Sequence, residues 1–315
     1  MTDILTVTLN PCVDLSTSAP AVLPGPKLRC TEPVIDPGGG GINVSRAISN
    51  LGGQSQAIIA VAGSTGDQIC ALLQAEKITH IPFAMAGKSR QSLSVTDTQN
   101  GAQYRFVMPG PQWSKDDTLC LLAKLPDYAQ QESIVVLSGS MPPGVADNLP
   151  QQIADTLAAK NIRLYIDTAG PALPALFQPH QNKPTLLRLD MLEAEQAAGG
   201  PLRTFKDSAD FAQKSVLDGV ADIIILARGD QGSVLATKNQ RLFCKAAQVS
   251  VKSKTGAGDS FVGGFTLKMA EGQSLDIALQ YGVAAASAAV MTDATALCIK
   301  DDVERLLSQC TLSDI

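Results

Sequence analysis

Short runs of apolar, β-branched residues alternate with segments of helical period over the second half of the chain. Four such runs span residues 133–139, 163–167, 185–189 and 221–227. They are apolar on both faces, as expected of strands buried inside a parallel sheet. Between the first two runs, Leu149, Ile153 and Leu157 recur every four residues and predict a helix that ends near Asn161. The alternation predicts an α/β fold with a mostly parallel central sheet between helical layers, in which ligands bind at the carboxyl ends of the strands.

Two early stretches break this pattern. Residues 12–37 are rich in proline and lack a helical period, whereas residues 88–109 alternate polar and apolar side chains, which indicates strands with one solvated face. We expect the two stretches to form one small antiparallel sheet, inserted as a lid. The α/β core would then comprise residues 1–11, 38–87 and 110–315.

Composition narrows the functional classes. The 315 residues carry a formal net charge of −5 without a basic tract, which argues against a nucleic-acid partner. No apolar run is long enough to cross a bilayer, and the first residues lack the features of a signal peptide, so we expect no membrane partner. Seven cysteines without a CxxC spacing, and only two histidines, predict a cytoplasmic protein without a zinc site.

The first candidate for chemistry is the segment 255–260, Thr-Gly-Ala-Gly-Asp-Ser. It follows a strand-like run at 247–251 and precedes a helix expected over about 261–271. Small residues at a helix N-terminus let backbone N–H groups converge on an anion. A carboxylate repels a phosphate there, so Asp259 is a candidate base that takes a proton from an attacking hydroxyl. The alternative is that Asp259 only caps the helix.

The second candidate is the segment 37–43, in which four consecutive glycines follow a proline and lead to Asn43. A helix is expected over 44–51. Each glycine costs roughly 0.5–1 kcal/mol relative to alanine in regular structure, so the run needs a compensating gain. Close approach of the backbone to a ligand is the interpretation we prefer, with Asn43 offering a donor and an acceptor to hydroxyls. The alternative is a flexible loop.

These two segments, together with further motifs that follow the order found in that family, resemble the ribokinase-like sugar kinases, in their phosphofructokinase-B branch. The further motifs lie at residues 8–14, 27–29, 90–91, 104–106 and 138–144. The resemblance covers nearly the whole chain and implies a three-layer αβα domain with a β-sheet lid. In this branch, 1-phosphofructokinases and tagatose-6-phosphate kinases usually carry lysine as the third residue of the glycine run. Gly40 stands there instead, which resembles the minor bacterial 6-phosphofructokinases (phosphofructokinase-2).

The resemblance also implies roles for individual residues. Asp259 would deprotonate the sugar 1-hydroxyl. Charge on the transferring phosphoryl group would be held by the amides of Gly256, Ala257 and Gly258. Sugar hydroxyls would be bound by Asp14, Gly39 and Asn43. The phosphate of the sugar would be bound by Lys27, Arg29, Arg90 and Ser140, with the first two reaching it from a partner subunit. Arg105 is a further lid cation, and the alternative for all four cations is a solvated sheet face.

The nucleotide side departs from the family pattern. The usual Lys-Pro-Asn-x-x-Glu is replaced by a stretch that contains Arg188, Asp190 and Glu193. The two carboxylates are three residues apart, so on a helix they share a face and could order magnesium-bound water. Four further nucleotide contacts are expected. Ala227 replaces a hydroxyl residue that usually precedes the glycines of the next motif, here Gly229 and Gly232, and Thr292 replaces an asparagine near the adenine pocket. These changes are either neutral drift or a sign of weakened ATP use.

The leading hypothesis is an ATP- and magnesium-dependent kinase that phosphorylates C1 of fructose 6-phosphate, with tagatose 6-phosphate as the second choice. The alternatives are a kinase for fructose 1-phosphate or a nucleoside, and a non-catalytic sugar-phosphate-binding protein with a degenerate nucleotide site. We expect a homodimer formed through the lids. A monovalent cation near residues 253–255 and inhibition by excess ATP are left open by the sequence.

Overall fold

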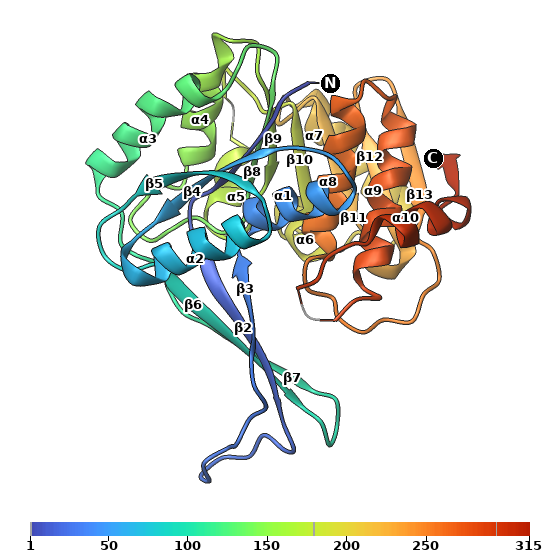
Figure 1. Ribbon diagram of the computed structural model, residues 1–315. Coiled ribbons are helices and arrows are strands. Elements are labelled where there is room, and N and C mark those ends of the chain that lie inside the picture. The colour runs from blue at the N-terminus through green and yellow to red at the C-terminus, as the bar shows by residue number, and fades with distance from the viewer. Residues whose placement is uncertain (1, 179, 294) are drawn as a thin grey trace.

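The protein contains two β-sheets, one large and one small, as the computed structural model shows for residues 2–178, 180–293 and 295–315 (Figure 1). Within these residues the large sheet has ten strands in the order β14-β13-β12-β11-β10-β9-β8-β1-β4-β5. In chain order they are β1 (Ile4–Thr8), β4 (Gln56–Val61), β5 (Thr79–Ala84), β8 (Ile134–Ser138), β9 (Arg163–Asp167), β10 (Leu186–Asp190), β11 (Ile223–Ala227), β12 (Gly232–Ala236), β13 (Arg241–Lys245) and β14 (Leu312–Asp314).

The seven strands from β5 to β11 pair in parallel, and β12, β13 and β14 add an antiparallel edge. This confirms the predicted mostly parallel α/β sheet. The four predicted buried runs become β8, β9, β10 and β11. They carry apolar side chains toward both faces because helices cover both faces.

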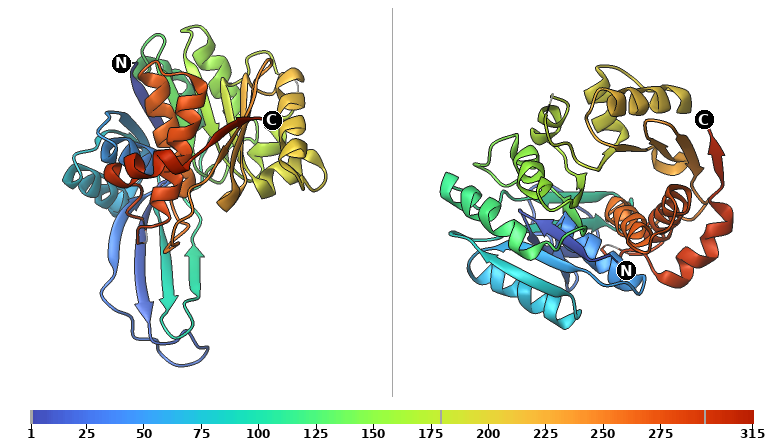
Figure 2. Two further views of the ribbon diagram at one scale, coloured as in Figure 1. Left: turned by 90° about the vertical axis from the view of Figure 1, so that its right-hand side faces the viewer. Right: turned by 90° about the horizontal axis from the view of Figure 1, so that it is seen from above.

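Alternate strand residues point into two separate cores. Ile4 and Ile134 belong to one core, whereas their neighbours Leu5 and Val135 belong to the other. The first face is covered by α1 (Gly40–Asn50), α2 (Gly63–Ala75), α8 (Ala257–Ala270), α9 (Leu275–Ala289) and α10 (Lys300–Leu306). The second is covered by α3 (Lys115–Tyr128), α4 (Leu149–Ala158), α5 (Ala172–Leu176), α6 (Met191–Ala198) and α7 (Phe205–Leu217). Two 3-10 turns complete the helices, η1 (Gly229–Gln231) and η2 (Leu307–Gln309). The result is a three-layer arrangement (Figure 2).

The small sheet consists of β2 (Cys12–Ala19), β3 (Val34–Gly38), β6 (Arg90–Asp97) and β7 (Gln103–Val107), in the order β3-β2-β6-β7. It extends from the carboxyl end of the large sheet as a narrow projection (Figures 1 and 2). The prediction of an antiparallel sheet was wrong at its centre, where β2 and β6 pair in parallel. The chain leaves the core through β2 and returns through β3, and it later leaves through β6 and returns through β7. The two outgoing strands, β2 and β6, lie side by side and are therefore parallel. That the two inserted ranges act as a lid stays a prediction.

Three predicted elements near the glycine-rich segments also differ from the structure. α1 begins at Gly40, inside the glycine run, and α8 begins at Ala257 rather than near residue 261. The expected strand at 247–251 does not form, because β13 ends at Lys245 and already has a partner on each side. Among the described residues, no helix is both long and apolar enough to span a membrane.

Candidate active site

A cavity of about 350 Å³ lies where the small sheet meets the large domain. Its walls come from the first halves of β2 and β6, from β7, from the start of α1, from the turn after β8 and from the loops before α8 and after α9. Seven predicted site residues line it: Asp14, Gly39, Asn43, Arg90, Ser140, Gly256 and Asp259. Residues separated by more than 200 positions in the sequence are therefore brought into one space, at the carboxyl end of the parallel strands.

Asp259 lies in the first turn of α8, but it does not cap that helix. The N-cap residue is Gly256, with φ of 76°, and no side chain forms a capping hydrogen bond there. The Asp259 carboxylate instead accepts a hydrogen bond of 2.9 Å, on Oδ2, from Nδ2 of Asn43. This bond joins the start of α1 to the start of α8, and it rules out the helix-cap alternative for Asp259 in this conformation.

The surroundings of Asp259 favour its protonated form. Burial of the carboxyl group and the nearby negative charge of Asp167 raise the pKa of Asp259 to about 7, against the opposing effects of Asn43 and Arg188. A carboxyl group with a pKa near neutrality is suited to accept and release a proton at physiological pH. The geometry and the pKa together fit a general base.

The glycine run packs closely against the protein itself, and its close approach to a ligand stays a prediction. A Cβ on Gly40 would lie 2.3 Å from Ser138 Oγ and 2.5 Å from the backbone nitrogen of Gly139. A Cβ on Gly38 would lie 2.0 Å from an oxygen of Asp14. Gly40 and Gly41 let α1 begin directly against β8 and β1, whereas Gly38 lets β3 pack against Asp14 of β2. Of the run, only Gly39 and Gly40 also line the cavity. The flexible-loop alternative is excluded, because Gly40 and Gly41 are helical.

The small sheet contributes two of the cations that line the cavity, Arg90 and Arg105. Arg90, at the start of β6, donates from Nε to the carbonyl of Asn10 at 3.1 Å and from Nη1 to Ser92 Oγ at 3.3 Å, so its guanidinium is held in place. Arg105 lines the same cavity from β7. Burial raises the pKa of Asp14, while Cys12, Arg90 and Arg105 oppose this shift. An acidic side chain and two cations thus face the same space.

Lys27 and Arg29 are not brought to this cavity by their own chain. Both are exposed and belong to the connection between β2 and β3, at the end of the small sheet that is remote from the large domain (Figure 1). Their predicted contact with the sugar phosphate requires a second subunit. Ser140 does line the cavity, and its Oγ accepts a 3.1 Å hydrogen bond from Nδ2 of Asn10.

The predicted nucleotide residues do not line the cavity described above. Arg188 of β10 lies behind the turn that precedes Asp259, because its guanidinium nitrogens come within 3.1–3.2 Å of where a Cβ on Gly258 would stand. It forms a 2.9 Å ion pair with Asp167. The arginine therefore supports the turn from inside and neutralises a carboxylate below it, instead of pointing into the cavity.

Asp190 and Glu193 form a capping box at the start of α6. Oδ1 of Asp190 accepts from the backbone nitrogen of Glu193, and Oε2 of Glu193 accepts from the backbone nitrogen of Asp190, each at 2.8 Å. Burial raises the pKa of Glu193 to about 7. A D-x-x-E pattern before a helix is a known capping signal, so the sequence contained this information. The two carboxylates therefore lie close together because they form the cap of α6, and not because both lie one turn apart inside the helix.

The remaining predicted nucleotide residues have local structural roles. Gly232 adopts φ of 117°, and a Cβ there would lie 2.0 Å from the carbonyl oxygen of Cys244 on β13. Gly229 also has positive φ but faces open space. The Thr292 hydroxyl is buried and donates to carbonyls of its own turn, those of Ala289 and Leu297. Ala227 ends β11.

Polar residues of the cavity wall that sequence reasoning missed include Lys254 and Thr295. Lys254 immediately precedes the glycine turn, and a cation next to an anion-binding motif was a readable signal. Thr295 lines the cavity from the loop between α9 and α10, and no local pattern marked it. All seven cysteines are free thiols. The described residues contain no cluster of three His, Cys, Asp or Glu side chains that could hold a metal ion.

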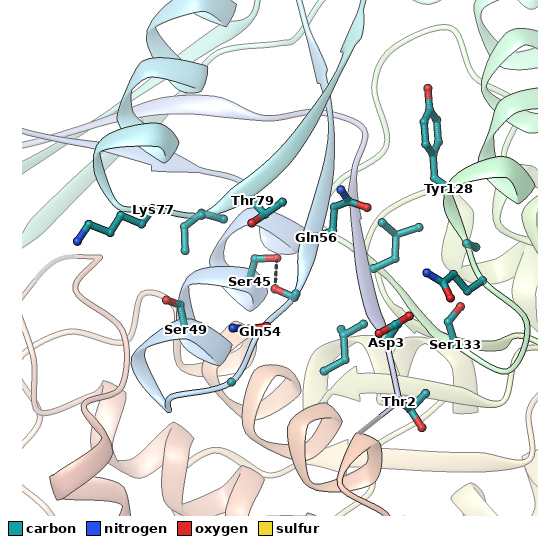
Figure 3. A pocket seen from close by; sticks show the side chains of 17 residues that line it. Thr2, Asp3, Ser45, Ser49, Gln54, Gln56, Lys77, Thr79, Tyr128 and Ser133 are labelled. Carbon is teal, nitrogen blue, oxygen red and sulfur yellow. Dashed lines mark hydrogen bonds between the residues drawn. The ribbon is translucent and has the colours of Figure 1, made fainter.

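A larger cavity, of about 610 Å³, lies elsewhere, at the amino ends of β1, β4 and β8. Its lining is rich in hydroxyl and amide side chains, among them Ser45, Gln56 and Ser133 (Figure 3). It contains none of the predicted site residues, and it lies at the opposite end of the sheet from the carboxyl ends of the strands, where α/β proteins bind their ligands. Size therefore does not identify the site here.

Comparison with known proteins agrees with the geometry. The sequence matches the pfkB family of carbohydrate kinases over residues 4–302, and the chain belongs to this family. The ribokinase-like fold is also seen in Arabidopsis thaliana ribokinase, with a TM-score of 0.74 at 18% identity over 97% of this chain and 98% of that one. The chain is thus a phosphotransferase of the carbohydrate-kinase class.

Within the family, the chain is 36% identical to ATP-dependent 6-phosphofructokinase isozyme 2 of Escherichia coli, over 97% of this chain and 98% of the relative. Crystal structures of the E. coli protein match with TM-scores of 0.91 in complex with fructose 6-phosphate, 0.92 in complex with potassium and 0.90 in a tetrameric inhibited form. Each covers 98% of this chain and 99% of the E. coli chain at 36% identity. The 1-phosphofructokinase of Bacillus subtilis is more distant, at 28% identity over 92% of this chain and 93% of the relative.

Proposed function

We propose that this protein transfers the γ-phosphoryl group of ATP to the C1 hydroxyl of fructose 6-phosphate and thereby forms fructose 1,6-bisphosphate. The observation that carries the proposal is the pairing of Asp259 with Asn43 in a cavity that also holds Arg90 and Arg105. The E. coli relative, with its stated ATP dependence and its complex with fructose 6-phosphate, supports this choice of donor and acceptor.

The two sides of the cavity suit an acceptor with a hydroxyl at one end and a phosphate at the other. The core side carries the carboxylate of Asp259, and the lid side carries the guanidinium groups of Arg90 and Arg105. Arginine binds phosphate oxygens in pairs, so two arginines are enough to hold a phosphate dianion. Between these groups, Asn43 Oδ1 is buried without a hydrogen-bond partner among the described residues, and it can accept from a sugar hydroxyl.

In the proposed reaction, Asp259 removes the proton of the C1 hydroxyl while the oxygen of that hydroxyl attacks the γ-phosphorus of ATP. The bond between that phosphorus and the bridging oxygen of ATP breaks, and ADP leaves with the bond's electron pair. Backbone amides of residues 256–258, at the positive end of the α8 dipole, stabilise the charge on the transferring group. Asn43 orients the Asp259 carboxylate through its 2.9 Å bond. The catalytic gain comes from positioning and from preorganised dipoles.

Magnesium enters this proposal together with ATP. The capping box uses one oxygen of each carboxylate, Oδ1 of Asp190 and Oε2 of Glu193. The second oxygens are suited to accept hydrogen bonds from metal-bound water, which is how Mg²⁺ is commonly held beside substrate phosphates. The residues therefore fit the ion through water, and bound magnesium would neutralise phosphate charge. Arg188, Ala227, Gly229, Gly232 and Thr292 complete the proposed nucleotide side.

A potassium ion near residues 253–255 is a further part of the proposal, since a structure of the E. coli relative contains potassium. This segment is held against the end of α9, because the backbone nitrogens of Lys252 and Ser253 both donate to the carbonyl of Val290, at 2.8 and 3.3 Å. A fixed loop beside the anion turn can place carbonyl oxygens around a cation.

We further propose a homodimer formed through the lids. The small sheet exposes large apolar side chains that a monomer leaves in water: Leu23, Val34, Tyr104, Phe106, Val107 and Met108. Pairing two lids would cover these side chains and could bring Lys27 and Arg29 of one subunit toward the cavity of the other. The E. coli relative has a tetrameric form, so assembly is a property of a related protein. The seven free thiols favour a reducing compartment, such as the cytoplasm.

One observation favours a second candidate, a sugar-phosphate-binding protein without catalysis. On the nucleotide side, Arg188, Asp190 and Glu193 all engage in bonds within the protein, whereas the sugar side keeps an unpartnered acceptor. This candidate predicts binding of sugar phosphate alone, whereas the kinase must also bind ATP and magnesium.

The deciding experiment measures ADP release by the purified protein with ATP–Mg²⁺ and each of three acceptors: fructose 6-phosphate, tagatose 6-phosphate and fructose 1-phosphate. We expect the highest kcat/KM with fructose 6-phosphate. Calorimetric titration with ATP–Mg²⁺ and with fructose 6-phosphate runs in parallel. Sugar binding without nucleotide binding or turnover would establish the second candidate instead. Preference for tagatose 6-phosphate or fructose 1-phosphate would leave the kinase class intact and change the acceptor.

A further inference from the structure

A cluster of charged and polar side chains around a buried arginine connects the lid with the loop between α9 and α10, next to the candidate active site. Its centre is Arg46 of α1, whose side chain is 8% exposed. The guanidinium donates from Nη2 to Asp36 Oδ1 of β3 at 3.4 Å and from Nη1 to the carbonyl of Thr295 at 3.2 Å. The Thr295 hydroxyl donates to Asp36 Oδ2. Asp36, Arg46 and Thr295 therefore form a closed triangle of hydrogen bonds. Glu76, at the end of α2, holds the other side of Arg46 with two bonds of 2.7 and 2.9 Å.

Each member of the triangle is one step from a group that the proposed reaction uses. Asp36 lies opposite Asp14 in the β2–β3 pair. Arg46 follows Asn43 by three residues on α1, so the helix that carries the Asp259 partner also carries the centre of the cluster. Thr295 lines the cavity itself. A shift at any corner of the triangle would therefore move a part of the site.

The loop beyond Thr295 connects the triangle to the anion turn. Nδ2 of Asn50, one turn further along α1, donates to the carbonyls of Ala296 and Cys298 at 3.3 and 3.1 Å. Between them, the side chain of Leu297 occupies the space that a Cβ on Gly256 would need. The same helix thus fixes both the lid strand β3 and the loop that packs on the phosphate-binding turn.

We propose that Asp36, Arg46 and Thr295 are positioning residues that couple closure of the lid on the sugar to the geometry of the nucleotide side. The cluster is more costly to build than an apolar contact, because desolvation of buried charges opposes their attraction. A geometric task accounts for that cost. The triangle makes the lid strand, α1 and the 295–298 loop move together, so that occupation of one subsite changes the affinity of the other. This inference rests on the proposed function.

The test compares two isosteric substitutions that each remove one negative charge beside Arg46. Asp36→Asn weakens the triangle, whereas the matched control Glu76→Gln weakens only the anchor at α2. Neither residue lines the cavity. The binding of a non-hydrolysable ATP analogue with Mg²⁺ is titrated with and without fructose 6-phosphate, and the ratio of the two dissociation constants is the coupling factor. A coupling factor of about fivefold or more is expected for the unmodified protein.

Asp36→Asn should reduce the coupling factor to below about twofold while each ligand alone binds within about threefold of the unmodified protein. Glu76→Gln should keep the coupling factor. Thr295→Val should also reduce the coupling factor, and Thr295→Ser, which retains the hydroxyl, should keep it. An unchanged factor in Asp36→Asn, an equal loss in Glu76→Gln, or no coupling in the unmodified protein would overturn the inference.

Hydrogen exchange of the ligand-free protein gives a readout that does not depend on the proposed function. Loss of the triangle should raise the exchange rates of the amides at 295–298 by about tenfold in Asp36→Asn but not in Glu76→Gln. If the unmodified protein binds neither ligand, the proposed function fails, and this measurement still decides whether the triangle holds the loop. Equal exchange rates in the two variants would overturn the inference.

Discussion

The proposed sugar side and the proposed nucleotide side of this protein are built in different ways. On the sugar side, Asp14, Asn43 and Arg90 come from three separate segments and face one cavity. On the nucleotide side, Arg188 and Asp190 lie close together in sequence, and each is engaged by a neighbour, in an ion pair or a capping box. The first set can respond directly to a ligand, whereas the second must first release or share existing bonds. Substitutions on the sugar side should therefore have large effects, and those on the nucleotide side small ones.

The largest effect is expected from Asp259→Asn. Loss of the proposed base should lower kcat by about 10²–10⁴-fold while the dissociation constant of fructose 6-phosphate changes little. Steady-state kinetics and calorimetry measure the two quantities. The same change should raise the melting temperature above pH 7, because the unmodified protein then contains a buried negative charge with a pKa raised from 3.8 to about 7. Retention of more than about a tenth of the activity would rule out Asp259 as the base.

The next effect in size is expected from Arg90→Gln. The substitution removes a fixed cation from the lid side of the cavity, and a charge-assisted hydrogen bond contributes about 1.5–3 kcal/mol. KM for fructose 6-phosphate should therefore rise by about 10–150-fold, with a much smaller change in KM for ATP. Arg163→Gln, on β9 and outside the cavity lining, is the control and should change neither constant. Equal effects on both substrates would contradict a separate sugar-phosphate subsite.

The pH dependence of kcat/KM should show an acid limb near pH 7. Asp259 accepts a proton only when ionised, so activity should be full about one unit above its pKa and fall about tenfold per unit below it. Glu193, whose pKa is also raised to about 7, could produce a similar limb. The profile of Glu193→Gln separates the two, because the limb should persist if it belongs to Asp259. A limb that disappears in this variant would assign the titration to the nucleotide side.

The smallest effect is expected from Asp190→Asn, which restores the amide found in the family pattern. Asparagine is as good an N-cap as aspartate, so α6 should keep its start and the melting temperature should change little. Removal of one negative charge near ATP should lower KM for ATP–Mg²⁺ by less than about fivefold and leave KM for the sugar unchanged. A much larger gain would show that the departure at residue 190 had weakened ATP use, and the comparison of the two sides would then need revision.

The fold was predictable wherever local periodicity carried the information. β9 has the bounds that its apolar run predicted, because its three central residues are buried between the helical layers and polar side chains stand only at its two ends, Arg163 and Asp167. The pairing direction of β2 and β6 was not predictable, because alternation of polar and apolar residues is the same in parallel and antiparallel strands. The direction depends on where each hairpin leaves the core, which is a tertiary property.

The site was predictable for residues that lie in compact motifs. Asn43 and Asp259 each belong to a glycine-rich segment, and the structure joins them directly. Asp36 and Thr295 were missed, since each is ordinary in its own segment and their contact spans most of the chain. The capping box at Asp190 was missed for another reason. Its D-x-x-E pattern is present in the sequence, but the same two residues belong to the family motif near the ATP phosphates and magnesium, so they were assigned to metal binding.

The close packing of Gly40 has a consequence for altering the acceptor of this enzyme. Sugar kinases of this branch that use other acceptors usually have lysine at the corresponding place. Here a new side chain would meet the main chain of the turn after β8, whose Gly139 nitrogen would be 2.5 Å from the first added carbon. A single replacement would therefore have to displace the 138–139 turn or the helix start before it could present its amine. A redesign of acceptor preference has to change both segments together, and variants that change only one should be recovered as misfolded protein.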